Sequence, residues 1–201
     1  YFLVAANQSN KVAVVDLKEG DLEALVDVGE VPHPGRGANW IDPEFGPVWT
    51  TPHLGEGSLV SIATDPDGNP DFAWKSVRTT PLPGAGSLFV KTHPNSPWVW
   101  VDMTLNSDPA LARTVCVIAK DNPAEVYKCW EVASYGRAVH FEYNKDGDEL
   151  WVSVWGVADN PGETGEIVIY DDATLEEKAR ITGLITPTGK FNVYNTINDI
   201  Y

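Results

Sequence analysis

The segment VPHPGRGANW, residues 31–40, combines turn-forming residues with two side chains that can do chemistry. Its prolines and glycines are what a tight turn needs, but a turn does not need His33 or Arg36. His33 titrates near neutrality and can donate a proton, while the Arg36 guanidinium is a fork that suits carboxylates. Gly35 and Gly37 would let the backbone approach a ligand closely. The segment indicates either a ligand-binding loop or a rigid connection, and its local chemistry favours neither.

The other candidate residues are more dispersed. His53 and His93 lie in the turn-like sequences TTPHLGEG and KTHPNS, so each is expected to hydrogen-bond backbone within its own turn. The chain contains no HExxH, CxxC, GxSxG or P-loop motif, and no metal-ligand set is predicted. The segment ITPTGKFNVYNT, residues 185–196, is a second polar cluster, in which Thr188 and the Gly189 backbone could line a ligand or form a closing strand.

The charge balance is strongly acidic. Twenty-nine Asp and Glu face 14 Lys and Arg, for a net charge of -15. A nucleic-acid groove needs a basic face, so no nucleic-acid partner is expected; the acidity suits a basic protein partner or simply solubility. No apolar run approaches the roughly 20 residues of a membrane span. The first residues lack the basic start of a signal peptide, and we expect further chain upstream.

Short strand-like segments dominate the chain. They are rich in β-branched and aromatic residues and alternate with turn sequences such as DPDGNP and NKDGDE. Helical periodicity is absent, and DPALAR offers one turn at most. Two patterns repeat, since residues 10–29 resemble residues 165–183, and THPNSPWVWVDM resembles YNKDGDELWVSVW.

These repeats predict an all-β fold of blade-sized units. The units cover residues 1–32, 33–83, 84–134 and 135–184, on average about 45 residues, which is typical of β-propeller blades. Four units could close into a ring or form half of a larger ring, which we favour; a β-sandwich is the alternative. Cys116 and Cys129 lie in adjacent strand-like segments, where they could form a disulfide or remain two buried thiols.

Five stretches, spread in order over the whole chain, give a family resemblance. They are HPGRGANW, FGPVWTTPHLGEGS, GSLFVKTHPNS, EYNKDGDELWVSVW and TPTGKFNVYNT. They resemble the C-terminal half of the d1-haem domain of cytochrome cd1 nitrite reductases. The resemblance implies about four blades of an eight-bladed propeller. Residues 1–201 would be the C-terminal part of that domain, with the first blades and a small c-type cytochrome domain absent.

The resemblance also implies roles for single residues. His33 matches a distal histidine that supplies protons to nitrite above the d1 iron, and Arg36 matches a partner of the macrocycle's carboxylates. Phe89 and Trp155 match aromatic residues packed against the ring. Thr188 and Gly189 match the final segment that lines it.

His140, in RAVHFEYN, departs from the family pattern, because reductases usually carry glutamine at this position. A histidine there could contact the substrate side or ligate the iron.

The function implied is the one-electron reduction of nitrite to nitric oxide at haem d1. The cofactors would be haem d1 with its iron, and haem c in the upstream domain. The partners would be nitrite, a small electron-donor protein (a c-type cytochrome or cupredoxin) and, for the full-length protein, a second subunit in a periplasmic homodimer. His140 keeps an alternative open, a d1-biosynthesis propeller such as the dehydrogenase that acts on a d1 precursor. A non-catalytic binding scaffold is a further alternative.

Overall fold

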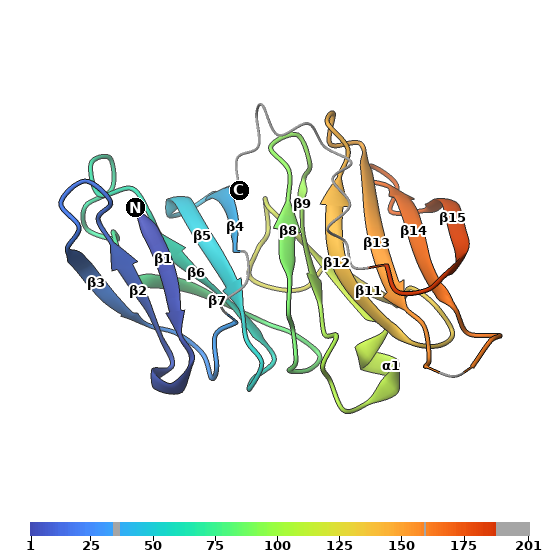
Figure 1. Ribbon diagram of the computed structural model, residues 1–201. Helices are drawn as coiled ribbons and strands as arrows, with labels where there is room; N and C mark the ends of the chain where they lie inside the picture. The colour runs from blue at the N-terminus through green and yellow to red at the C-terminus, as the bar shows by residue number, and fades with distance from the viewer. Residues whose placement is uncertain (34–36, 159, 188–201) are drawn as a thin grey trace.

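Four antiparallel sheets make up the part of the chain that the computed structural model describes, residues 1–33, 37–158 and 160–187. Figure 1 shows them side by side in an arc, from the β1–β3 sheet at one end to the β12–β15 sheet at the other. Each sheet is a meander, in which strands that are consecutive in sequence are neighbours in space. This confirms the all-β propeller architecture, and the β-sandwich alternative is wrong.

The strands fall within the four predicted units. The first sheet has three strands and each of the other three has four within the described ranges. The elements are, in chain order, β1 (Phe2–Ala6), the 3-10 helix η1 (Asn7–Ser9), β2 (Lys11–Val15), β3 (Leu22–Asp27), β4 (Ala38–Asp42), β5 (Gly46–Pro52), β6 (Ser58–Ala63), β7 (Ser76–Pro81), β8 (Val90–Thr92), β9 (Trp98–Asp102), α1 (Pro109–Ala112), β10 (Thr114–Ala119), β11 (Lys128–Glu131), β12 (Arg137–Tyr143), β13 (Glu149–Trp155), β14 (Gly165–Asp171) and β15 (Glu177–Leu184). Neither helix in the described ranges has the length or apolar character to cross a membrane.

The hydrophobic core lies between neighbouring sheets. One cluster joins the first and second sheets around Val12 and Ile62, and another joins the second and third around Trp40 and Val101. The third cluster, around Trp100, joins the last two sheets. Strands in the middle of a sheet are therefore buried on both faces, which explains why β6 and β10 are continuous apolar or small-residue runs and do not alternate.

The first strands of the last three sheets form the inner edge of the arc. β8 lies against β4 on one side and against β12 on the other. The chain enters each sheet at its inner strand, so the starts of β4, β8 and β12 meet at one end of the fold (Figure 1). Residues far apart in sequence are brought together there.

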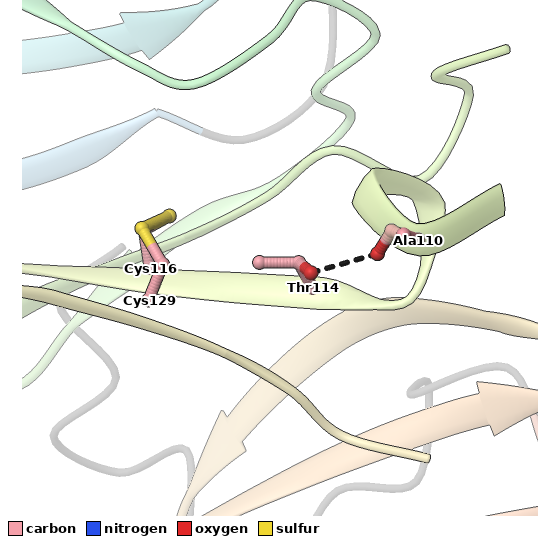
Figure 2. Close-up of a disulfide and its surroundings, with 4 residues drawn as sticks. All are labelled: Ala110, Thr114, Cys116 and Cys129. Carbon is pink, nitrogen blue, oxygen red and sulfur yellow. Dashed lines mark hydrogen bonds between the residues drawn. A yellow bond between two sulfur atoms is a disulfide. The ribbon is translucent and has the colours of Figure 1, made fainter. Parts of the chain in front are cut away.

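The two cysteines form a disulfide across the outer strands of the third sheet. Cys116 in β10 lies directly opposite Cys129 in β11, and Cys116 is fully buried. Figure 2 shows this bridge beside the start of β10, where Thr114 Oγ1 donates a hydrogen bond of 2.7 Å to the Ala110 carbonyl of α1. Of the two alternatives that the sequence left open, the structure has the disulfide.

The disulfide generates a stability prediction. It links residues 13 positions apart, and closing a loop of that size removes unfolded-state entropy worth about 3 kcal/mol. The double variant Cys116→Ala/Cys129→Ala should lower the free energy of unfolding by about 2–4 kcal/mol in urea denaturation. Thr114→Val, which removes one hydrogen bond from the same strand, serves as the control and should cost about 1 kcal/mol. Equal stability of the wild-type protein with and without reductant would contradict the prediction.

Candidate functional site

Four aromatic rings meet where the inner strands begin, and we call them the aromatic row. His33 precedes β4, Phe89 precedes β8, His140 lies in β12 and Trp155 ends β13. The ring centroids are 5.7 Å apart between His33 and Phe89, 4.0 Å between Phe89 and His140, and 6.1 Å between His140 and Trp155. The structure therefore brings together four residues that the sequence singled out, from three different sheets.

The loop that carries His33 is fastened to the turn between β5 and β6. The His33 amide donates to the Pro52 carbonyl (3.1 Å), and the Leu54 amide donates to the Val31 carbonyl (2.9 Å). Val31 has a φ of 53°, which is strained for a β-branched residue. This strain is held in place by the hydrogen bonds on either side, so His33 is presented from a fixed backbone.

His53 is a second fastening of this loop, and it is fully buried. Its Nε2 accepts a hydrogen bond from the Gly29 amide (3.0 Å), so Nδ1 carries the proton and donates to the Ser58 carbonyl (2.9 Å). We expected His53 to bond only backbone of its own turn, but it also holds a segment 24 residues away. His93 forms the expected bond within its turn, because its Nδ1 accepts from the nearby Asn95 amide (3.1 Å), but its ring also hydrogen-bonds the backbone of Lys145, which follows β12.

His140 occupies an irregular position in β12. The pairing register with β13 shifts between Val139 and Phe141, and His140 has a φ of 58°. A left-handed conformation costs a non-glycine residue about 1–2 kcal/mol. This β-bulge takes the side chain out of the strand's alternation and places its ring against Phe89, and such re-aimed side chains are common next to functional sites.

Trp155 closes the row at the end of β13. Its indole Nε1 is buried and has no hydrogen-bond partner among the described residues. Gly136 allows the close approach of β12 here, since its φ is 71° and a Cβ would lie 2.0 Å from the Trp155 carbonyl oxygen. A cavity of about 550 Å³ starts at the next residue, Gly156, and is also lined by Thr186.

Phe89 is held by a residue that sequence reasoning missed. Asp102, the last residue of β9, is fully buried and accepts hydrogen bonds from the Leu88 and Phe89 amides. The sequence feature that could have identified Asp102 is an acidic residue at the end of the apolar strand WVWVD.

The role of His53 was also underestimated, because a turn sequence does not show which distant segment the turn contacts.

Three predicted site residues lie outside the described part of the chain: Arg36, Thr188 and Gly189. Gly37 is described. A Cβ there would lie 1.9 Å from Cε2 of Trp49, so the packing of Trp49 against this backbone requires a glycine. Within residues 1–33, 37–158 and 160–187, no group of three or more His, Cys, Asp or Glu side chains is arranged to hold a metal ion.

Burial sets the protonation of the buried histidines. Desolvation lowers the pKa of His33, and a hydrogen bond from its ring to the Leu88 carbonyl partly opposes this shift. Desolvation also lowers the pKa of His53 and His93. All three rings are therefore neutral at pH 7, and His33 can accept a proton when a negative charge comes close.

Comparison with known proteins gives a consistent assignment. A family model described as Cytochrome D1 heme domain matches residues 1–196. A nitrite reductase of Stutzerimonas stutzeri is 48% identical over 220 residues, which cover 100% of this chain and 38% of that protein. The chain thus spans well under half the length of this curated relative.

Solved structures share the same fold. A dihydro-heme d1 dehydrogenase in complex with DHE aligns with a TM-score of 0.77 at 26% identity, over 95% of this chain and 37% of the other. The hydrazine synthase of Kuenenia stuttgartiensis aligns with a TM-score of 0.67 at 19% identity, over 89% and 50% of the two chains. The second likeness concerns the fold alone.

The depressed histidine pKa values predict acid sensitivity. In the unfolded chain these histidines bind protons as the pH falls below about 6.5, while the folded state resists protonation. The contribution of these histidines to the free energy of unfolding should therefore be fully present above pH 6.5 and be lost as the pH falls toward the lower folded-state pKa values, whereas the raised pKa values of Asp102 and Asp172 add a slope of the opposite sign. Urea denaturation between pH 7.5 and 5 measures this slope. His53→Gln, which cannot titrate, should flatten it, and an unchanged slope in that variant would exclude His53 as a contributor.

Proposed function

This chain belongs to the cytochrome D1 haem domain family, and we propose that it is the C-terminal part of the haem d1 propeller of a nitrite reductase. The full-length protein would reduce nitrite to nitric oxide and water, consuming one electron and two protons. The remaining blades and a c-type cytochrome domain with haem c would come from the rest of the chain. Such a protein would act in the periplasm as a homodimer and receive electrons from a small c-type cytochrome or cupredoxin.

The aromatic row is the observation that carries this proposal. The rings of Phe89 and Trp155 offer flat apolar contacts for a macrocycle. The buried Trp155 Nε1 is a donor without an acceptor among the described residues, and haem d1 carries several carboxylates that could accept from it. Buried polar groups are nearly always paired, so this donor fits an anionic edge of the cofactor. Arg36, Thr188 and Gly189 would complete the cradle by resemblance to the family.

Haem d1, when bound, would supply the iron that holds nitrite and the electron that reduces it. The protein would supply position and protons. His33 is neutral when alone because burial lowers its pKa, but an anion beside the ring favours the protonated imidazolium. His33 would therefore take up a proton as nitrite binds and donate it to the nitrite oxygen that leaves as water. The Leu88 carbonyl, which accepts from the His33 ring, would fix the ring's orientation during this transfer.

His140 would limit the space on the substrate side. Its ring lies 4.0 Å from that of Phe89, which places it in the same wall as His33. In this position the imidazole can hydrogen-bond nitrite in the role that the family's glutamine would take. Its identity as histidine also supports a second candidate, a dehydrogenase of a d1 precursor, to which the 26% identity and TM-score of 0.77 add weight.

His33→Ala tests the reductase proposal directly. Loss of a positioned proton donor should lower kcat by about 100-fold or more, measured as nitric oxide formed from nitrite by the full-length protein loaded with haem d1. His93→Ala is the matched control, because desolvation lowers the pKa of His93 as it lowers that of His33, but His93 follows β8 at the opposite end of the inner strand. Normal turnover in the His33 variant, or no turnover in the wild type, would overturn the proposal.

His140→Gln separates the two candidates. In a reductase the substitution restores the usual family residue, and nitrite turnover should stay within a few-fold of the wild type. In a d1-precursor dehydrogenase the wild type should oxidise the dihydro-haem and show little nitrite turnover. Measuring both reactions in both proteins gives the answer, and a wild type that reduces nitrite only after the substitution would favour the dehydrogenase.

A further inference from the structure

One buried carboxyl group organises the segment between the two site histidines. Asp102 is 0% exposed, and its Oδ1 accepts hydrogen bonds from the Leu88 amide (2.7 Å), the Phe89 amide (3.1 Å) and Ser87 Oγ (3.3 Å). Three donors on one oxygen fix the backbone of residues 87–89. This segment leads into β8 and would otherwise be an irregular connection.

The fixed segment contacts both histidines of the aromatic row. The Leu88 carbonyl accepts a hydrogen bond from the His33 ring. The N–H of the same peptide group, that of Phe89, donates to Asp102. This one peptide group therefore connects Asp102 to His33. The Phe89 ring contacts His33 on one side and His140 on the other. Moving residues 88 and 89 would therefore displace the partners of both histidines together.

Thr104 extends the network to the strand that carries His140. Its hydroxyl lies beside the Asp102 carboxyl and donates to the Ala138 carbonyl (2.6 Å), two residues before His140. The Thr104 hydroxyl thus connects the Asp102 carboxyl at the end of β9 with the backbone of β12.

The Asp102 carboxyl is stabilised by these donors. Burial raises the pKa of Asp102 to about 6, although the hydrogen bonds from Leu88, Phe89, Thr104 and Ser87 act in the opposite direction. An asparagine keeps an oxygen that can accept from the Leu88 and Phe89 amides, whereas an alanine offers no acceptor. Substitution can therefore separate the role of the acceptor oxygen from that of the charge.

We propose that Asp102 is the positioning residue of the aromatic row, holding Phe89 between His33 and His140 through the amides of residues 88 and 89. It touches none of the reacting groups, and acts on haem d1 binding through residues 88 and 89. The effect on haem d1 binding rests on the proposed function. The position of Phe89 between the two histidines does not depend on that function. The competing explanation is a carboxyl that only stabilises the third sheet.

The experiment uses the full-length protein with and without haem d1. Asp102→Ala should release haem d1 about tenfold faster than the wild type, since the amides of residues 88 and 89 lose their acceptor. Asp102→Asn should retain haem d1 and the wild-type absorption spectrum. Asp42→Ala is the control for loss of a buried carboxyl away from the site, because Asp42 holds the Glu44 and Phe45 amides at the far end of β4 and is also paired with Arg78. It should leave haem d1 release unchanged.

A second measurement, in the apo-protein, tests the positioning role of Asp102 independently of the proposed haem d1 function. Ring-current shifts of the His33 and His140 imidazole protons report the position of Phe89, and they should change in Asp102→Ala but not in Asp102→Asn or Asp42→Ala. Unchanged shifts in Asp102→Ala would overturn the inference, as would an Asn variant that behaves like Ala. If Asp102→Ala does not fold, Thr104→Val should give a smaller change in the same shifts, and none would also overturn it. A wild type that binds no haem d1 would instead remove the proposed function.

Discussion

Packing between the faces of neighbouring sheets is the interaction on which the rest of the structure depends. Each of the three apolar clusters joins two sheets and contains strands from both. A sheet with two apolar faces is stable only between two neighbours, so the sheets assemble side by side around a common axis. The inner strands β4, β8 and β12 then lie next to one another, and their starts meet at one end. The candidate site is the place where these ends meet.

Convergence of strands brings residues near each other but does not fix their orientation. Buried polar groups that contact the backbone of the aromatic row fix this orientation. His53 holds the backbone before His33 through Gly29, and Asp102 holds the backbone of Phe89. His53 and Asp102 each accept hydrogen bonds from backbone amides in segments that are not paired in a sheet. The strain at Val31 and His140 can persist because these neighbouring segments are so firmly attached.

The sequence was sufficient to predict the sheets and much of the row. Short β-rich segments with regular turn sequences define the four units. The local sequence identifies His33, and the family resemblance adds Phe89, His140 and Trp155, which the fold brings together with it. The contacts of His53 with Gly29 and of Asp102 with residues 87–89 could not be predicted, because they join turns whose distance in space depends on sheet packing. Gly37 shows the same limit, since its neighbour Trp49 comes from the adjacent strand. Arg36, Thr188 and Gly189 stay predictions.

The β-bulge at His140 has a consequence for how such a site can change over time. The ladder pairs Val139 with Ser153 and Phe141 with Val152, and passes over the residue between them. The side chain at this position is therefore independent of the strand pairing that holds the sheet together. A single codon change there can exchange one polar group for another at the centre of the row while the scaffold stays intact. If the proposed role of His140 holds, the position that changes the chemistry is separate from the positions that hold the sheet together, which would let related propellers diverge in reaction without diverging in shape.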